Sequence, residues 1–105
     1  MLKGSAARPY GRRTMPEVHH ETAFFTGRVQ GVGFRYTALQ TAREFDVSGF
    51  VSNLPDGRVV LEAEGRPEEV EAFIVAVLER MHGYVRDVDR HAHVRDAQFA
   101  GFSIR

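Results

Sequence analysis

The sequence predicts a small α+β domain in which two helices cover one face of an antiparallel sheet. The chain has 105 residues, 43% of them hydrophobic, which is enough for one core and too short for two domains. Its apolar residues alternate in some stretches and recur at helical spacing in others, and glycine or proline separates these stretches. The order is strand, helix, strand, strand, helix, strand, which is typical of the ferredoxin-like βαββαβ arrangement.

The first strand and the first helix are predicted on either side of a glycine-rich stretch. Residues Thr22 to Val29 alternate as in a strand with at least one buried face. The helix begins at Phe34 and runs to about Glu44 or Phe45, with Arg35 in its first turn. Its apolar stripe consists of Phe34, Ala38, Leu39, Ala42 and Phe45.

A hairpin follows the first helix. Val47 to Leu54 and Arg58 to Glu64 are strand candidates that we expect to pair antiparallel. The turn between them is Pro55-Asp56-Gly57, where proline fixes φ and glycine tolerates a left-handed conformation. We therefore interpret Asp56 as a turn residue.

The second helix is predicted from the longest helical stripe in the chain. Pro67 suits the first helical position, and an unbroken apolar stripe follows it. The stripe consists of Val70, Phe73, Ile74, Val77, Leu78 and Met81. Tyr84 to Val94 has few aliphatic residues and is predicted to be an edge strand, and Phe99 to Ile104 a short closing strand.

The first twenty residues differ in composition from the rest. They carry Lys3, Arg8, Arg12 and Arg13 with scattered glycine and proline, and no apolar run long enough for a signal peptide or a membrane span. We interpret residues 1–20 as a flexible basic tail that joins the fold, residues 21–105, near His19-His20. A targeting or RNA-contacting arm is the alternative.

Charge and cysteine content exclude several classes of function. The 14 basic and 14 acidic side chains cancel, so no overall positive field attracts nucleic acid or acidic membranes. The chain has no cysteine, which rules out disulfides and thiolate metal sites and suits a reducing, cytoplasmic location. The histidines lack the convergent ligands that a metal needs, so we expect no metal site. We also expect no cofactor and a monomer.

Residues 27–35, Gly-Arg-Val-Gln-Gly-Val-Gly-Phe-Arg, have the composition of an anion-binding loop. Gly27, Gly31 and Gly33 can adopt positive φ angles, so that successive backbone N–H groups turn towards one anion beside a helix N-terminus. Arg35 adds a planar cation that can bind two phosphate oxygens at once. The sequence therefore predicts a phosphate site.

This loop, together with residues 49–57, Gly-Phe-Val-Ser-Asn-Leu-Pro-Asp-Gly, resembles the acylphosphatase family in content, order and separation. The resemblance implies metal-independent hydrolysis of small acyl phosphates to a carboxylate and inorganic phosphate. It also implies that Arg35 binds the phosphate and that Asn53 orients the attacking water. The expected phosphate ligands are the backbone N–H groups of Gln30, Gly31, Val32, Gly33, Phe34 and Arg35.

Asn53 has a simpler interpretation as a residue that caps the following turn. If the first strand and the strand at 47–54 were neighbours in the sheet, Asn53 would lie beside the loop that starts the first helix. Spacing alone does not establish that contact, and it is the resemblance that implies it.

Two other functions compete with hydrolysis. An RNA-binding ferredoxin-like module is suggested by the glycine and aromatic residues at 31–36, but such a motif belongs on a central strand, whereas here it enters a helix. A regulatory domain that binds phosphate without turnover is the third possibility. A water-orienting Asn53 favours the enzyme, because binding alone does not need it.

Overall fold

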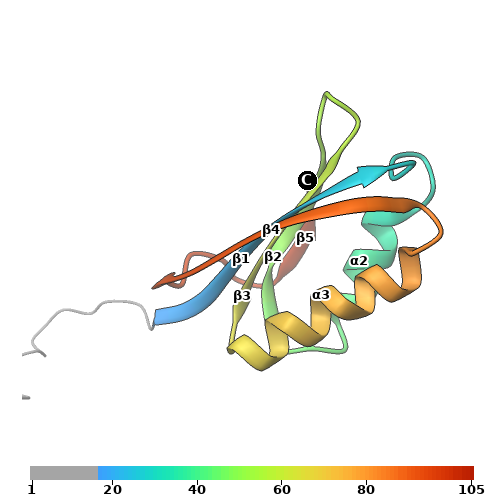
Figure 1. Ribbon diagram of the computed structural model, residues 1–105. Helices are drawn as coiled ribbons and strands as arrows, with labels where there is room; N and C mark the ends of the chain where they lie inside the picture. The colour runs from blue at the N-terminus through green and yellow to red at the C-terminus, as the bar shows by residue number, and fades with distance from the viewer. Residues whose placement is uncertain (1–16) are drawn as a thin grey trace, which may run out of the picture.

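The computed structural model describes residues 17–105, which form a five-stranded sheet with both helices on one face (Figure 1). The order of the strands across the sheet is β4-β1-β3-β2-β5. The elements are β1 (Glu17–Gly27), α2 (Phe34–Ala42), β2 (Val47–Asn53), β3 (Val59–Gly65), α3 (Pro67–Met81), β4 (Val85–Asp96) and β5 (Phe102–Ile104).

The predicted βαββαβ order is confirmed, and the closing stretch adds a fifth strand. β1 pairs antiparallel with β3 and β4, and β2 pairs antiparallel with β3. β5 pairs parallel with β2, so the sheet is mixed at that edge and not wholly antiparallel. β4 forms the other edge, as its composition predicts.

The limits of several elements differ from the expectation. β4 continues to Asp96, and β5 begins at Phe102 and not at Phe99. β1 begins at Glu17 and ends at Gly27, so residues 17–20, which were assigned to the tail, belong to the sheet. The sequence does not indicate this part of the strand, because His20 and Glu21 are polar. Both are nevertheless buried against partners on the neighbouring strands β3 and β4, which are distant in the sequence. Residues 1–16 of the expected tail lie outside the described residues. α2 ends at Ala42, and residues 43–45 continue as a tighter turn whose amides bond three residues back.

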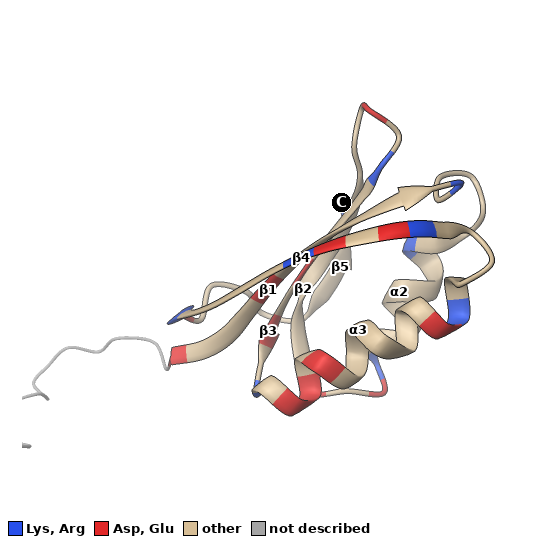
Figure 2. Ribbon diagram, in the orientation of Figure 1, with Lys and Arg blue, Asp and Glu red and all other residues tan. Residues whose placement is uncertain are grey.

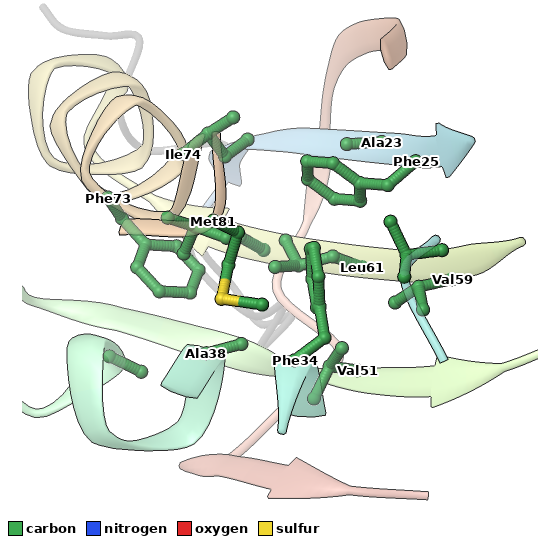
Figure 3. Packing of buried hydrophobic residues seen from close by; sticks show 14 of the residues in the cluster. Ala23, Phe25, Phe34, Ala38, Val51, Val59, Leu61, Phe73, Ile74 and Met81 are labelled. Carbon is green, nitrogen blue, oxygen red and sulfur yellow. The ribbon is translucent and has the colours of Figure 1, made fainter. Parts of the chain in front are cut away.

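The core lies between the helices and the sheet (Figure 3). The stripe predicted for α3 faces it, with Leu78 half-buried and the other members buried. Phe34 at the start of α2 is 2% exposed and lies against Phe25 of β1, with the ring centroids 4.8 Å apart. This contact fixes where α2 begins relative to the sheet.

The face of the sheet opposite the helices is crossed by residues 97–101, which link the two edges. Phe99 packs there on Phe50 of β2 and on the imidazole of His20. The buried carboxylate of Glu64 accepts hydrogen bonds from the backbone N–H groups of Gln98, at 2.8 Å, and Phe99, at 3.1 Å. Glu64 therefore fastens the crossing segment to the central strand β3.

The guanidinium of Arg95 completes the surroundings of Glu64, donating from Nε at 2.9 Å and from Nη2 at 2.7 Å. Burial disfavours the ionised carboxylate, but the hydrogen bonds from Gln98, Arg95 and Phe99 outweigh burial and hold the pKa of Glu64 below its usual value. Burial and the charge of Arg95 lower the pKa of His20, in spite of the nearby Glu62 and Glu64. His20 is therefore neutral at pH 7.

We expect Glu64→Gln to lower the free energy of unfolding by about 3 kcal/mol, because an amide cannot balance Arg95 and turns a donor towards existing donors. Urea unfolding at pH 7 measures this loss. Glu68→Gln is the matched control, since the Glu68 side chain is 65% exposed and pairs only with the exposed Arg66. Equal stability of the two variants would contradict the role assigned to Glu64.

The free energy of unfolding should also decrease as the pH falls. The folded pKa values of His20 and Glu64 lie below their ordinary values of 6.5 and 4.5, so in acid the unfolded chain binds more protons than the folded protein. We expect a first decrease below about pH 6.5, from His20, and a second below about pH 4.5, from Glu64. The difference in the free energy of unfolding between wild type and Glu64→Gln should become smaller only below about pH 4.5. Urea titrations at several pH values will measure it.

Candidate active site

The loop between β1 and α2 owes its shape to two glycines. Gly31 and Gly33 have φ angles of 78° and 80°, which side chains other than glycine rarely adopt. A Cβ atom at either position would meet no atom within 4 Å, so glycine is needed there for the backbone angle and not for space. Gly27 differs, because it ends β1 at an irregularity where a Cβ would collide with the carbonyl oxygen of Tyr84. Gly27 is therefore needed because the backbone at the start of β4 lies too close to leave space for a side chain.

The N-terminus of α2 is left without a protein cap. Gly33 occupies the N-cap position, no side chain caps the helix, and its first turn has no acidic residue. α3 also lacks a side-chain cap, but it has Pro67 at its start and two acidic residues, Glu68 and Glu69, in its first turn, as the acidic colouring there indicates (Figure 2). The first backbone bond of α2 runs from the N–H of Thr37 to the carbonyl of Gly33. The earlier N–H groups have no intrahelical partner and give this end a partial positive charge.

Three successive residues at this helix start point in different directions. Phe34 is buried in the core, whereas Arg35 and Tyr36 are exposed. Within residues 17–105, Arg35 forms no ion pair with a carboxylate. A free guanidinium beside a partly positive helix end is unfavourable by about 0.3–1 kcal/mol, and a bound anion would relieve both charges.

The side chain of Gln30 connects this loop to the turn after β2. Its Nε2 atom donates to the carbonyl oxygens of Leu54, at 2.8 Å, and Arg58, at 2.9 Å. Both carbonyls also accept bonds within the turn, from Gly57 and from Leu54 respectively. Gln30 therefore holds the glycine loop against the hairpin that carries Asn53.

Asn53 and Arg35 line the same pocket. The pocket has a volume of about 240 Å³, and its walls come from the glycine loop, the start of α2, the end of β2 and β5. β1 and β2 are not neighbours in the sheet, because β3 lies between them. α2 nevertheless crosses to pack against β2 and β5, and this brings its N-terminus to the end of β2.

The structure thus brings together most of the predicted site residues. Gly31, Gly33, Phe34, Arg35 and Asn53 line the pocket, whereas Gln30 contacts the hairpin turn and Val32 packs against the core. Sequence reasoning missed two further lining residues, Tyr36 and Ile104. The position of Tyr36 beside Arg35 was a usable signal, whereas Ile104 reaches the pocket only through the pairing of β5 with β2.

Asp56 lies in the turn as predicted, where its carboxylate accepts from the backbone N–H and the Nε atom of Arg58. These two hydrogen bonds lower its pKa. Within the described part of the chain, no cluster of three or more histidine, aspartate or glutamate side chains is arranged to hold a metal ion. Across residues 17–105, no helix has both the length and the apolar character needed to cross a membrane.

Comparison with known proteins places this chain in a family. The model of the Acylphosphatase family matches residues 21–104. Acylphosphatase from Methanospirillum hungatei is 39% identical over 79 residues, 75% of this chain and 85% of that protein. Acylphosphatase from Salinibacter ruber is 45% identical over 85 residues, 80% of this chain and 90% of that protein.

The same family is found among solved structures. The crystal structure of acylphosphatase from Bacillus subtilis superposes with a TM-score of 0.73 and 34% sequence identity, covering 83% of this chain and 98% of that one. The sequence and the fold thus indicate the same class of small α+β domain. This chain belongs to the acylphosphatase family.

We expect Gln30→Ala to loosen the loop from the hairpin, because the two hydrogen bonds to Leu54 and Arg58 are lost. The free energy of unfolding should fall by about 1–2 kcal/mol, and amide hydrogen exchange should accelerate in residues 30–35. Gln40→Ala is the matched control, since Gln40 bonds only the exposed Arg43. Unchanged exchange in the loop would mean that Gln30 is not its anchor.

Proposed function

We propose that this protein is an acylphosphatase that hydrolyses the carboxyl-phosphate bond of small acyl phosphates, without a metal. The observation that supports this most directly is the meeting of Arg35, Asn53 and the uncapped start of α2 in one pocket. Family membership independently supports an acyl phosphate as substrate and inorganic phosphate as product.

In the proposed reaction, the phosphoryl group binds against the glycine loop. The guanidinium of Arg35 binds two phosphate oxygens, and N–H groups of residues 30–35 donate to the phosphate. These groups neutralise the negative charge that would otherwise repel the lone pair of the attacking water oxygen. Because the backbone N–H groups are held by the helix and by the buried Phe34, they need little reorganisation during the reaction.

Asn53 orients the water for in-line attack on phosphorus. A bond forms from the water oxygen to phosphorus while the bond from phosphorus to the acyl oxygen breaks, and the carboxylate leaves with the electron pair. The water proton is taken up by the phosphate product. A carboxylate is a good leaving group, so the protein supplies position and charge and needs neither a nucleophile nor a metal.

The proposal also covers the location of the protein, its oligomeric state and its partners. We propose that the protein acts as a cytoplasmic monomer without nucleic acid. Chain-wide charge neutrality supports the absence of a nucleic-acid partner.

The direct test is hydrolysis of acetyl phosphate by the purified full chain, with and without a chelator. Release of phosphate that a chelator does not affect is the expected result. Activity that disappears on chelation and returns with a divalent ion would contradict the metal-independent mechanism. Phosphate binding without turnover would favour a regulatory domain.

Arg35→Lys should reduce kcat/KM by about 10³-fold or more, because an ammonium cannot bind two phosphate oxygens in one plane. Arg35 is exposed and outside the core, so the fold should persist, which circular dichroism will check. Arg43→Lys is the matched control at the other end of the same helix, and it should keep full activity. Near-normal turnover in Arg35→Lys would mean that the backbone N–H groups suffice.

Asn53→Ala should lower kcat by about 10²- to 10³-fold and change inhibition by inorganic phosphate much less, because Asn53 is proposed to orient water and not to hold the anion. Ser48→Ala, near the other end of β2, is the control. If Asn53 were only a turn residue, the variant would lose about 1 kcal/mol of stability and keep its turnover. Measuring kcat, the phosphate inhibition constant and Tm on one preparation separates the two roles.

A further inference from the structure

The pocket that holds Arg35 and Asn53 has an apolar side that the proposed chemistry leaves unused. Tyr36 is 61% exposed and Ile104 is 40% exposed, and both line the pocket. They are two of the five large hydrophobic side chains that the described residues expose, the others being Val75, Tyr84 and Val94. Two apolar side chains in the wall of a phosphate pocket form a surface that a ligand can cover.

The geometry of the substrate directs its acyl group to this surface. In the proposed complex, the glycine loop and Arg35 hold the phosphoryl group. The remainder of a bound acyl phosphate must therefore extend along the wall of the pocket. Among the lining residues Arg35 is the only charged one, and it is engaged by the phosphate. No second cation lines the pocket within residues 17–105 to receive an anionic acyl group.

The two side chains come from different elements and are held independently. Tyr36 lies in the first turn of α2, directly after Arg35. Ile104 lies in β5 opposite Val51, and the next residue, Arg105, donates its backbone N–H to the carbonyl of Val51 at 2.8 Å. Asn53 follows Val51 by two residues on the same face of β2, so the β5 side chain is kept close to the reacting centre.

We propose that Tyr36 and Ile104 bind the acyl group and make this protein selective for acyl phosphates with an uncharged aromatic or branched aliphatic acyl group. Together these two side chains form the apolar wall of the pocket. The inference rests on the proposed hydrolysis and adds its substrate class. Contact of an aromatic substrate with the wall accounts for a preference of about tenfold over an acyl group too small to reach it.

The test compares benzoyl phosphate with acetyl phosphate, whose carboxylate leaving groups have similar acidity. The wall is removed in the double variant Tyr36→Ser with Ile104→Ser. We expect the ratio of kcat/KM for benzoyl over acetyl phosphate to fall about tenfold, with kcat/KM for acetyl phosphate changed less than about threefold. The control is Tyr84→Ser with Val94→Ser, which removes a similar apolar surface that is exposed outside this pocket and should leave the ratio unchanged.

A binding measurement keeps this inference separate from the proposed function. Benzylphosphonate and methylphosphonate cannot be hydrolysed, and calorimetry gives their Kd values whether or not the protein turns over. We expect benzylphosphonate to bind about tenfold more tightly than methylphosphonate to wild type, and the two to bind equally to the wall variant. Hydrolysis of acetyl phosphate without any benzyl preference would overturn the apolar wall and leave the acylphosphatase activity standing. A benzyl preference without hydrolysis would overturn the activity alone.

Discussion

The contact between Phe34 and Phe25 fixes the geometry on which the site depends. Because Phe34 is the first residue of α2 and lies in the core, the helix cannot rotate or slide without removing an aromatic ring from its packing, a loss of several kcal/mol. The residues on either side are then directed by the helix itself. Gly33 turns the backbone before it, and Arg35 and Tyr36 are turned outward after it. A hydrophobic contact thereby orients a cation.

Gln30 and Phe34 have complementary effects on the same loop. Phe34 anchors its end to the sheet, and Gln30 fastens its middle to the hairpin through Leu54 and Arg58. The two positions that need a left-handed backbone, Gly31 and Gly33, lie between or beside these anchors. A loop fixed at two points keeps its N–H groups in position without the ligand, which is the preorganisation that electrostatic catalysis requires.

A local positive site in a neutral protein has a simple origin. The charges of the chain cancel, yet the start of α2 has unpaired N–H groups, no acidic residue and the cation of Arg35. Backbone dipoles act only within about the first turn, so they attract a small anion that enters the pocket and have little effect at long range. The protein can therefore favour phosphate without a general affinity for polyanions.

Much of this arrangement could be predicted from the sequence, because it depends on local rules. The glycine loop, the hairpin turn and the α3 stripe are each encoded within about fifteen residues, and each was found. The buried polar residues could not be predicted in this way, because their partners are distant in the sequence. His20 and Glu21 look like surface residues until Glu64 and Arg90, 44 and 69 positions away, provide their partners. Ile104 was missed for a related reason, since only the parallel pairing of β5 brings it to the pocket.

The segment that crosses the open face has a mechanical consequence. It joins β4 to β5 at opposite edges of the sheet, a separation of four strand spacings or about 19 Å. The six Cα–Cα steps from Asp96 to Phe102 reach only about 20–22 Å when fully extended. The link is therefore short for the distance between the edges, and Glu64 fastens its middle to the central strand. One edge of the sheet cannot peel away without pulling on the other, so the edges should open together, in a single cooperative event, instead of fraying strand by strand.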